Sequence, residues 1–314
     1  MPRVSVIVPA HNAAATIGAT LAALEAQDAN FEWEVIVVDD GSTDETRELV
    51  RRAGPRVCLV SQAQAGPGPA RDRGGEEAAA DLLAFTDADC VPTGGWLREG
   101  VAALAEADLV QGAVRPDPAA VPRPFDRTIW VNGRGGLYET ANLLVRRELF
   151  ATVGGFEDWL QARFGKPLAE DVWFGWRVRR AGARVAYSEA ALVHHAVFRR
   201  GIREYAGERL RLYYFPAIVG KIPELRDELL VDRVFLNRRT REFDAAAVGA
   251  ATAVATRSPW PLALAIPYAL TAVRGARRWG RTAAPRALAG DVAADVVGCA
   301  TLLAGGVRHR TPVL

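Results

Sequence analysis

The segment Glu34-Val-Ile-Val-Val-Asp-Asp40 is an apolar run that ends in two carboxylates. Two more apolar runs in the first third of the chain also lead into polar residues. Val4-Ser-Val-Ile-Val-Pro9 leads into Ala10-His-Asn12, and Leu82-Leu-Ala-Phe-Thr86 leads into Asp87-Ala-Asp89. Short runs that are apolar on both faces are typical of buried strands in a parallel sheet. Polar residues therefore follow the end of each predicted strand.

Segments with helical character separate these runs at residues 14–27, 42–52 and 66–80, and a further short apolar run lies at 57–60. This alternation predicts an α/β fold with a mostly parallel, Rossmann-like sheet and helices on both faces. Ligands of such sheets bind beyond the carboxyl ends of the strands. We therefore expect His11, Asp39, Asp87 and Asp89 to meet at one crevice, with a cation or hydrogen-bond donors among the carboxylates.

Asp87 and Asp89 are two residues apart, so both side chains point to one side at a strand end. Two oxygen ligands suit a Mg²⁺ or Mn²⁺ ion whose remaining coordination positions are filled by substrate phosphates. A solvated turn that caps the next helix has the same spacing, and both interpretations stay open. Asp39 could accept from a nucleobase or a ribose, or cap a helix, and Arg71 follows a Gly-Pro loop suited to phosphate.

Composition limits the class of protein. With 314 residues, 50% hydrophobic and 24% charged, the chain has room for one large or two modest globular domains and is neither collagen-like nor disordered. Its three cysteines form no CxxC motif or disulfide framework, and Val4–Val8 is too short for a signal-peptide core. We expect a cytoplasmic protein.

Charge is unevenly distributed along the chain. Residues 1–193 carry a net charge of −7 and residues 194–314 a net charge of +9, within a total of +2. This asymmetry predicts different partners for the two halves. The basic half is too apolar for a nucleic-acid module, so no nucleic-acid partner is expected.

Residues 196–314 predict a C-terminal helical region. The segments 245–256 and 258–273 lack charged residues, and 287–307 is apolar except for Asp291 and Asp295. Arginines are dense around them. We favour helices that lie on or dip into the inner leaflet of the cell membrane, with arginines on anionic headgroups. A soluble helical subdomain or a dimer interface is the alternative.

Several motifs together resemble a known family. Residues 4–12, Asp39-Asp-Gly-Ser-Thr-Asp44, Ala70-Arg-Asp-Arg-Gly74 and Asp87-Ala-Asp89 are similar to the nucleotide-binding half of a family 2 glycosyltransferase with the GT-A fold. The acceptor-side motifs of that family are matched by four later stretches: Thr140-Ala-Asn142, Gly154-Gly-Phe156, Glu170-Asp171 and His194. The resemblance covers about residues 3–195, which we take as the nucleotide-sugar-binding and catalytic domain, with 196–314 as the helical region.

The resemblance implies an inverting, metal-dependent transfer from a nucleoside-diphosphate sugar, at family level a UDP-sugar, to a hydroxyl acceptor that could be lipid-linked. Asp171 would be the catalytic base, with Asp89 and His194 at the metal and with Asn142, Glu170 and Trp173 in the acceptor or sugar pocket. The residues implied in nucleotide binding are Pro9, Ala10, His11, Asp39, Arg71, Asp87 and Ala88.

Two residues depart from the family pattern. His11 stands where the family often has tyrosine and Asp72 where it often has asparagine. No Q-x-x-R-W follows Asp171, which favours transfer of one or few sugars over processive synthesis.

The alternative functions are a sugar nucleotidyltransferase and a non-catalytic nucleotide-sugar-binding protein. Residue by residue, Glu170-Asp171 could simply stabilise a helix start, Trp173 could belong to the core, and His194-His195 could be ordinary strand-end residues.

Overall fold

The computed structural model describes residues 2–160 and 168–314 and separates into two compact units. The first unit consists of Met1–Val121 with Thr128–Val197, and the second of Pro122–Arg127 with Phe198–Leu314. The functional division at residues 195 and 196 stays a prediction. The sequence offered no sign that residues 122–127 pack with the C-terminal region.

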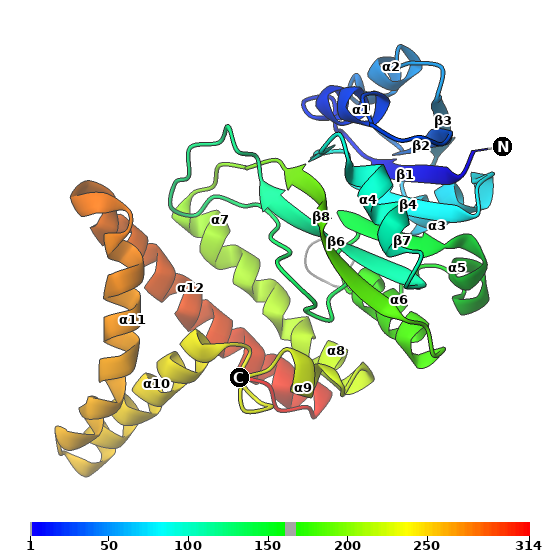
Figure 1. Ribbon diagram of the computed structural model, residues 1–314. Coiled ribbons are helices and arrows are strands. Elements are labelled where there is room, and N and C mark those ends of the chain that lie inside the picture. Colours follow the sequence, from blue (N-terminus) through cyan, green and yellow to red (C-terminus); the bar gives the residue numbers. More distant parts are fainter. Residues whose placement is uncertain (1, 161–167) are drawn as a thin grey trace. The chain divides into compact units, whose positions relative to one another are not determined.

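The first unit alternates strands and helices, as Figure 1 shows in blue to green. Its strands are β1 (Val4–Ala10), β2 (Trp33–Asp40), β3 (Val57–Gln62), β4 (Leu82–Thr86), β5 (Cys90–Pro92), β6 (Leu109–Pro116), β7 (Asn142–Arg146) and β8 (Val185–His195). Its helices are α1 (Ile17–Glu25), α2 (Thr46–Arg51), α3 (Pro67–Glu77), α4 (Trp96–Ala103), α5 (Arg147–Val153) and α6 (Glu170–Arg180).

Over the described residues, one sheet joins these strands in the order β3-β2-β1-β4-β7-β6-β8-β5. The strands β3, β2, β1 and β4 run parallel, as do β6 and β8, whereas β7 is antiparallel to both β4 and β6, and β5 is antiparallel to β8. The predicted α/β sheet with flanking helices is therefore confirmed, although it is more mixed than the predicted mostly parallel sheet.

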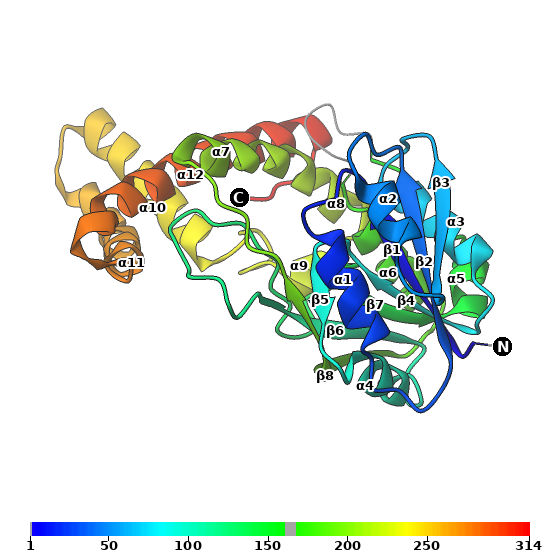
Figure 2. The same cartoon turned by 90° about the horizontal axis from the view of Figure 1, so that it is seen from above.

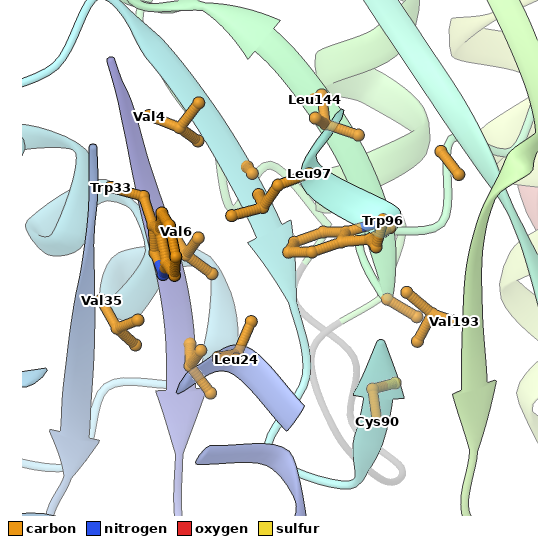
Figure 3. Packing of buried hydrophobic residues seen from close by; sticks show 14 of the residues in the cluster. Val4, Val6, Leu24, Trp33, Val35, Cys90, Trp96, Leu97, Leu144 and Val193 are labelled. Atoms are coloured by element: carbon orange, nitrogen blue, oxygen red, sulfur yellow. The ribbon is translucent and has the colours of Figure 1, made fainter. Parts of the chain in front are cut away.

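Side chains alternate between two packed faces of the sheet. On one face, Val4 and Val6 of β1 pack with Leu24 of α1 and with Trp96 and Leu97 of α4, which Figure 3 shows from close by. On the other face, Phe85 of β4 contacts Phe150 of α5 and Phe156, with ring centroids 5.6 and 5.3 Å apart. Both faces of β1, β2 and β4 are buried, which explains their uninterrupted apolar sequence.

Helix α3 lies unusually close to the sheet. A Cβ atom on Gly74 would approach Cγ2 of Ile7 to 2.4 Å, so only glycine fits at this crossing. This close approach sets the depth of Arg71, one turn earlier in α3, which is 5% exposed.

The second unit is helical. It comprises α7 (Ile202–Gly207), the 3₁₀ segment η1 (Glu208–Tyr214), α8 (Phe215–Lys221), α9 (Leu225–Glu228), α10 (Arg238–Thr256), the 3₁₀ segment η2 (Trp260–Ala265), α11 (Ile266–Arg277) and α12 (Gly280–His309). Helix α12 runs alongside α7 in Figures 1 and 2. Among the described helices, α12 alone is long and apolar enough to cross a membrane by length and composition. The predicted C-terminal helical region is confirmed.

Candidate active site

The carboxyl ends of the parallel strands carry the predicted polar residues. Ala10, at the end of β1, pairs in register with Asp39, at the end of β2. On the other side of β1, β4 ends at Thr86, and Asp87 and Asp89 follow immediately. These three neighbouring strands therefore deliver their polar residues to one edge of the sheet, as the sequence predicts.

His11 is held in one orientation beside this edge. Its Nδ1 donates to the backbone carbonyl of Asp40 at 2.8 Å, and its Nε2 accepts from the side-chain amides of Asn12 and Gln64 at 3.3 Å each. This network fixes the orientation of the ring, with a proton on Nδ1 facing the carbonyl. The exposed ring is the right kind of planar surface for a nucleobase.

The two carboxylates that end β2 have different surroundings. Asp40 accepts from Gln62 and from the backbone N–H groups of Ala65 and Gly66 at 2.8–2.9 Å, so it ties down the loop before α3. Asp39 is 1% exposed, lies 3.2 Å from Nε of Arg47 and accepts from the backbone of Ser42. Asp40 is a structural residue, whereas Asp39 keeps lone pairs for a ligand.

Arg71 joins the end of β4 to the start of α6. Its guanidinium donates to Asp87 at 2.8 Å and lies 3.5 Å from Glu170. Burial opposes the charge of Arg71, but the two carboxylates outweigh burial and raise its pKa. The arginine is therefore permanently charged, and it brings Asp87 and the Glu170-Asp171 pair to one place although more than 80 residues separate them.

Asp171 lies in the first turn of α6, behind Ala169, whose φ of 70° turns the chain into the helix. Burial, and then the neighbouring charge of Glu170, raise the pKa of Asp171 well above its ordinary range. The N–H of Val172 donates to its Oδ1 at 2.8 Å and opposes this shift only in part. The helix dipole alone would make this carboxylate a weaker base, and its surroundings reverse that effect.

Glu139 is a member of this acidic group that we did not predict. Burial raises its pKa, and its charge contributes to the raised pKa of Asp171. It lies in the segment before β7, where Gln111 of β6 donates to its backbone carbonyl at 3.1 Å. No motif marked it, because its position depends on β6 and β7 coming together.

A possible metal site lies beside Asp89. Among the described residues, the ligand atoms of Asp89, Cys90 and His195 lie within 4.8 Å of one another. Nε2 of His195 is 3.7 Å from Oδ1 of Asp89, which is within reach of one ion bound to both at about 2.1 Å. Nδ1 of His195 donates to the carbonyl of Ala196 at 2.6 Å, so Nε2 is the nitrogen that faces Asp89.

The other two residues of this region fit a metal less well. Burial raises the pKa of the Cys90 thiol well above its ordinary value, so the thiolate that a metal binds is disfavoured. His194, the histidine predicted for this role, pairs with Val91 across the sheet, and its Nδ1 lies 3.2 Å from the carbonyl of Pro116. Asp89 and His195 are thus the pair that fits an ion better in this geometry, and the role predicted for His194 stays a prediction.

Comparison with known proteins agrees with this geometry. The family model described as "Glycosyl transferase family 2" matches residues 5–154, which include the ends of β1, β2 and β4. This match covers nearly half of the chain. The predicted resemblance to family 2 glycosyltransferases is therefore supported over these residues.

Two curated glycosyltransferases illustrate the similarity. AglE of Haloferax volcanii is 33% identical over 175 residues, which cover 51% of this chain and 58% of the relative. The pre-mycofactocin glycosyltransferase of Mycobacterium tuberculosis is 27% identical over 210 residues, which cover 61% of this chain and 42% of the relative. The chain thus spans about half the length of these relatives.

Two solved structures share the fold. Mannosyltransferase PcManGT from Pyrobaculum calidifontis, in complex with GDP-Man and Mn²⁺, has a TM-score of 0.58 and 23% identity, covering 98% of this chain and 87% of that one. TarS 1–349 of S. aureus, in complex with UDP-GlcNAc, has a TM-score of 0.52 and 18% identity, covering 98% and 92%. The predicted GT-A type fold is confirmed by this likeness.

Two residues predicted for the acceptor or sugar pocket have extensive structural contacts, and their predicted role stays a prediction. The buried amide of Asn142 donates to the carbonyls of Ala113 and Ala191 at 2.8 and 2.7 Å, and accepts from Trp96 at 2.8 Å. It has little capacity left for a sugar, so we assign it to holding β6, β7 and β8 together.

Trp173 is the second of these residues. It is 9% exposed and donates to Glu157 at 2.7 Å, while the guanidinium groups of Arg180 and Arg177 lie 5.3 and 5.7 Å from its ring centroid. These arginines pack against the indole ring, which fits the alternative that Trp173 belongs to the protein core.

Proposed function

We propose that this chain is an inverting, metal-dependent and non-processive glycosyltransferase that moves a sugar from a nucleoside-diphosphate sugar to a hydroxyl acceptor. The observation that carries the proposal is the environment of Asp171. A carboxylate with a raised pKa stands beside a permanently charged arginine that also holds Asp87, two residues from the candidate metal ligand Asp89. A base and an anion-binding group are thereby paired.

The donor would bind along the edge formed by β1, β2 and β4. His11 and Asp39, with Pro9 and Ala10 behind them, would contact the base and ribose. Arg71, with Asp87 and Ala88, would lie beside the diphosphate. PcManGT and TarS were solved with GDP-Man and UDP-GlcNAc respectively, which supports a nucleoside-diphosphate sugar and leaves both bases open.

Asp89 and His195 would hold the divalent ion, Mn²⁺ or Mg²⁺. When bound, such an ion neutralises charge on the departing diphosphate. The Mn²⁺ in the PcManGT complex supports this choice of metal class. The imidazole nitrogen in the pair favours Mn²⁺ over Mg²⁺, which prefers oxygen ligands alone.

In the transfer step, the acceptor oxygen attacks the anomeric carbon from the side opposite the leaving group. The new C–O bond forms as the bond from carbon to the phosphate oxygen breaks, which inverts the anomeric centre. Asp171 takes the hydroxyl proton, and the raised pKa makes it a better base for this late proton transfer. Glu170 contributes by raising that pKa and by its contact with Arg71.

Thermal shift with UDP-, GDP-, TDP- and CMP-sugars, each with Mn²⁺ or EDTA, identifies the donor first. Asp171→Asn should then abolish transfer and donor hydrolysis while donor binding, measured by calorimetry, stays within about twofold. Asp158→Asn, an exposed aspartate outside the helix that carries Asp171, is the matched control and should keep full activity. Full activity in the Asp171 variant would end the assignment of the base. Donor binding without turnover in the native chain would support a non-catalytic nucleotide-sugar-binding protein. Nucleotidyl transfer would support a sugar nucleotidyltransferase.

The proposed location is the cytoplasmic face of the cell membrane, with a lipid-linked acceptor as one option. Support comes from the basic C-terminal region with its long apolar helix α12. Salt extraction followed by detergent extraction of membranes tests this location, and full recovery as a soluble monomer without either would contradict it.

A further inference from the structure

The second unit presents a helical hairpin made of the end of α10, η2 and the start of α11. Within residues 245–273 the only charged residue is Arg257. Large apolar side chains along this hairpin are nonetheless exposed, many by half or more: Val248 61%, Val254 80%, Trp260 84%, Leu262 49%, Leu264 48%, Ile266 57%, Leu270 49% and Val273 37%. Contiguous apolar exposure on this scale marks an interaction surface.

The tip of this hairpin is uncovered on nearly every side. In the last two turns of α10, residues 250–256, all positions except Ala253 are classed as exposed. A helix that is apolar all round is normally buried, either in a protein core or in lipid. Apart from its contact with η2, which lies beside the yellow-to-orange end of α10 in Figure 1, this stretch is exposed among the described residues.

The hairpin is preformed and fixed to its own unit. Gly249 lets α10 approach η2 so closely that a Cβ atom there would come within 2.5 Å of the carbonyl oxygen of Pro261. At the base, Arg239 of α10 makes a two-pronged contact with Asp295 of α12 at 2.7 and 2.9 Å, and Tyr268 of α11 donates to the same carboxylate at 2.8 Å. The exposed apolar face is therefore held in place before it meets a partner.

The charged residues in the hairpin and in the segment that follows it are all positive. Residues 245–290 contain no aspartate, glutamate or lysine, and their six arginines are Arg257, Arg274, Arg277, Arg278, Arg281 and Arg286. All six are exposed, and five follow the apolar stretch rather than interrupt it. An apolar tip bordered by arginines is complementary to a bilayer whose surface is anionic.

We propose that the tip, residues 248–270, inserts into one leaflet of an anionic lipid bilayer, with the arginines that follow it on the headgroups. Length sets the depth. The part of α10 within the tip, residues 248–256, is about 14 Å of helix, against about 15 Å for one leaflet, half of a hydrocarbon core of about 30 Å. The hairpin therefore enters one leaflet without crossing. This deepens the membrane partner of the proposed function and does not depend on the transfer reaction.

Vesicle sedimentation tests insertion without donor or acceptor. The full chain should pellet with vesicles of 30% phosphatidylglycerol in phosphatidylcholine. The double variant Trp260→Glu/Leu264→Glu should lose at least tenfold in partitioning. Trp130→Glu is the matched control, because Trp130 is 57% exposed in the first unit, and it should bind as the native chain does. Circular dichroism checks that each variant folds.

Tryptophan fluorescence tests insertion in the native chain, so the result does not depend on a variant that could be destabilised. Brominated lipids should quench the native chain more than Trp260→Phe, and the difference reports the depth of Trp260. Replacing Arg274, Arg277 and Arg281 by glutamine should weaken binding to anionic vesicles about fivefold per arginine and leave binding to neutral vesicles unchanged.

Three results would overturn the proposal. The first is native chain that stays in the supernatant with anionic vesicles. The second is a Trp260 signal that brominated lipid does not quench, together with a stable dimer that the double variant dissociates, which would identify a second copy as the partner. The third is resistance to carbonate extraction from native membranes, which would indicate a spanning helix.

Discussion

Asp72 is the residue whose replacement tests the electrostatics of this fold most directly. It lies in α3 next to Arg71, and its Oδ1 accepts from the backbone N–H of Phe156 at 2.7 Å. Burial raises its pKa to about 6 from an ordinary 3.8, while the Phe156 bond and the charge of Arg177 oppose that rise. Asparagine has the same shape and can accept the same bond, so Asp72→Asn removes the charge alone.

The sign of the effect follows from linkage. Because folding raises the pKa, the folded chain holds the proton more tightly than the unfolded chain between about pH 4 and pH 6. The ionised carboxylate therefore destabilises the folded state above pH 6, and this cost fades as pH falls through the same range. The rise in the pKa of Asp72 from 3.8 to about 6 corresponds to about 3 kcal/mol, and solvent screening of this partly exposed group reduces it to about 1–2 kcal/mol.

Urea denaturation of Asp72→Asn and native chain, from pH 4.5 to pH 8, measures the difference. The variant should be more stable by about 1–2 kcal/mol at pH 7.5, and this gain should shrink to about a third at pH 4.5. Asp158→Asn, on the surface, should show neither effect. A variant less stable than native at pH 7.5, or a gain that does not change with pH, would refute the reasoning, provided that the urea m-values agree.

Three further predictions concern the site. Glu170→Gln removes a negative charge that raises the pKa of Asp171, so the acidic limb of kcat/KM, where activity falls as Asp171 is protonated, should move to lower pH; an unchanged limb would mean that Asp171 is not the titrating base. His195→Gln should weaken Mn²⁺ binding at least tenfold in calorimetry, whereas His194→Gln should not, and the reverse result would restore the sequence-based choice. Asn142→Ala leaves three buried hydrogen-bonding groups without partners and should cost about 3 kcal/mol in urea unfolding, with a loss under 1 kcal/mol counting against its structural role.

Much of the first unit could be predicted because its information is local. Apolar runs become parallel strands, and the residues just after each run must then lie at one edge of the sheet. Asp39, Asp87 and Asp89 were located by this argument, since each directly follows an apolar run. The match of Glu170-Asp171 to a helix start was equally local, and α6 begins at Glu170.

Side-chain direction and packing could be decided only by the tertiary structure. His194 and His195 are neighbours in sequence, but adjacent residues of a strand point to opposite faces, and the pairing of Cys90 with His195 determines which one meets Asp89. Asn142 has the polarity of a ligand contact, yet three strands close around it. The pKa of Asp171 depends on burial and on Glu170 rather than on its place in a helix. The chain itself determines which groups reach the edge of the sheet, whereas their orientation, burial and partners arise from contacts between segments far apart in the sequence.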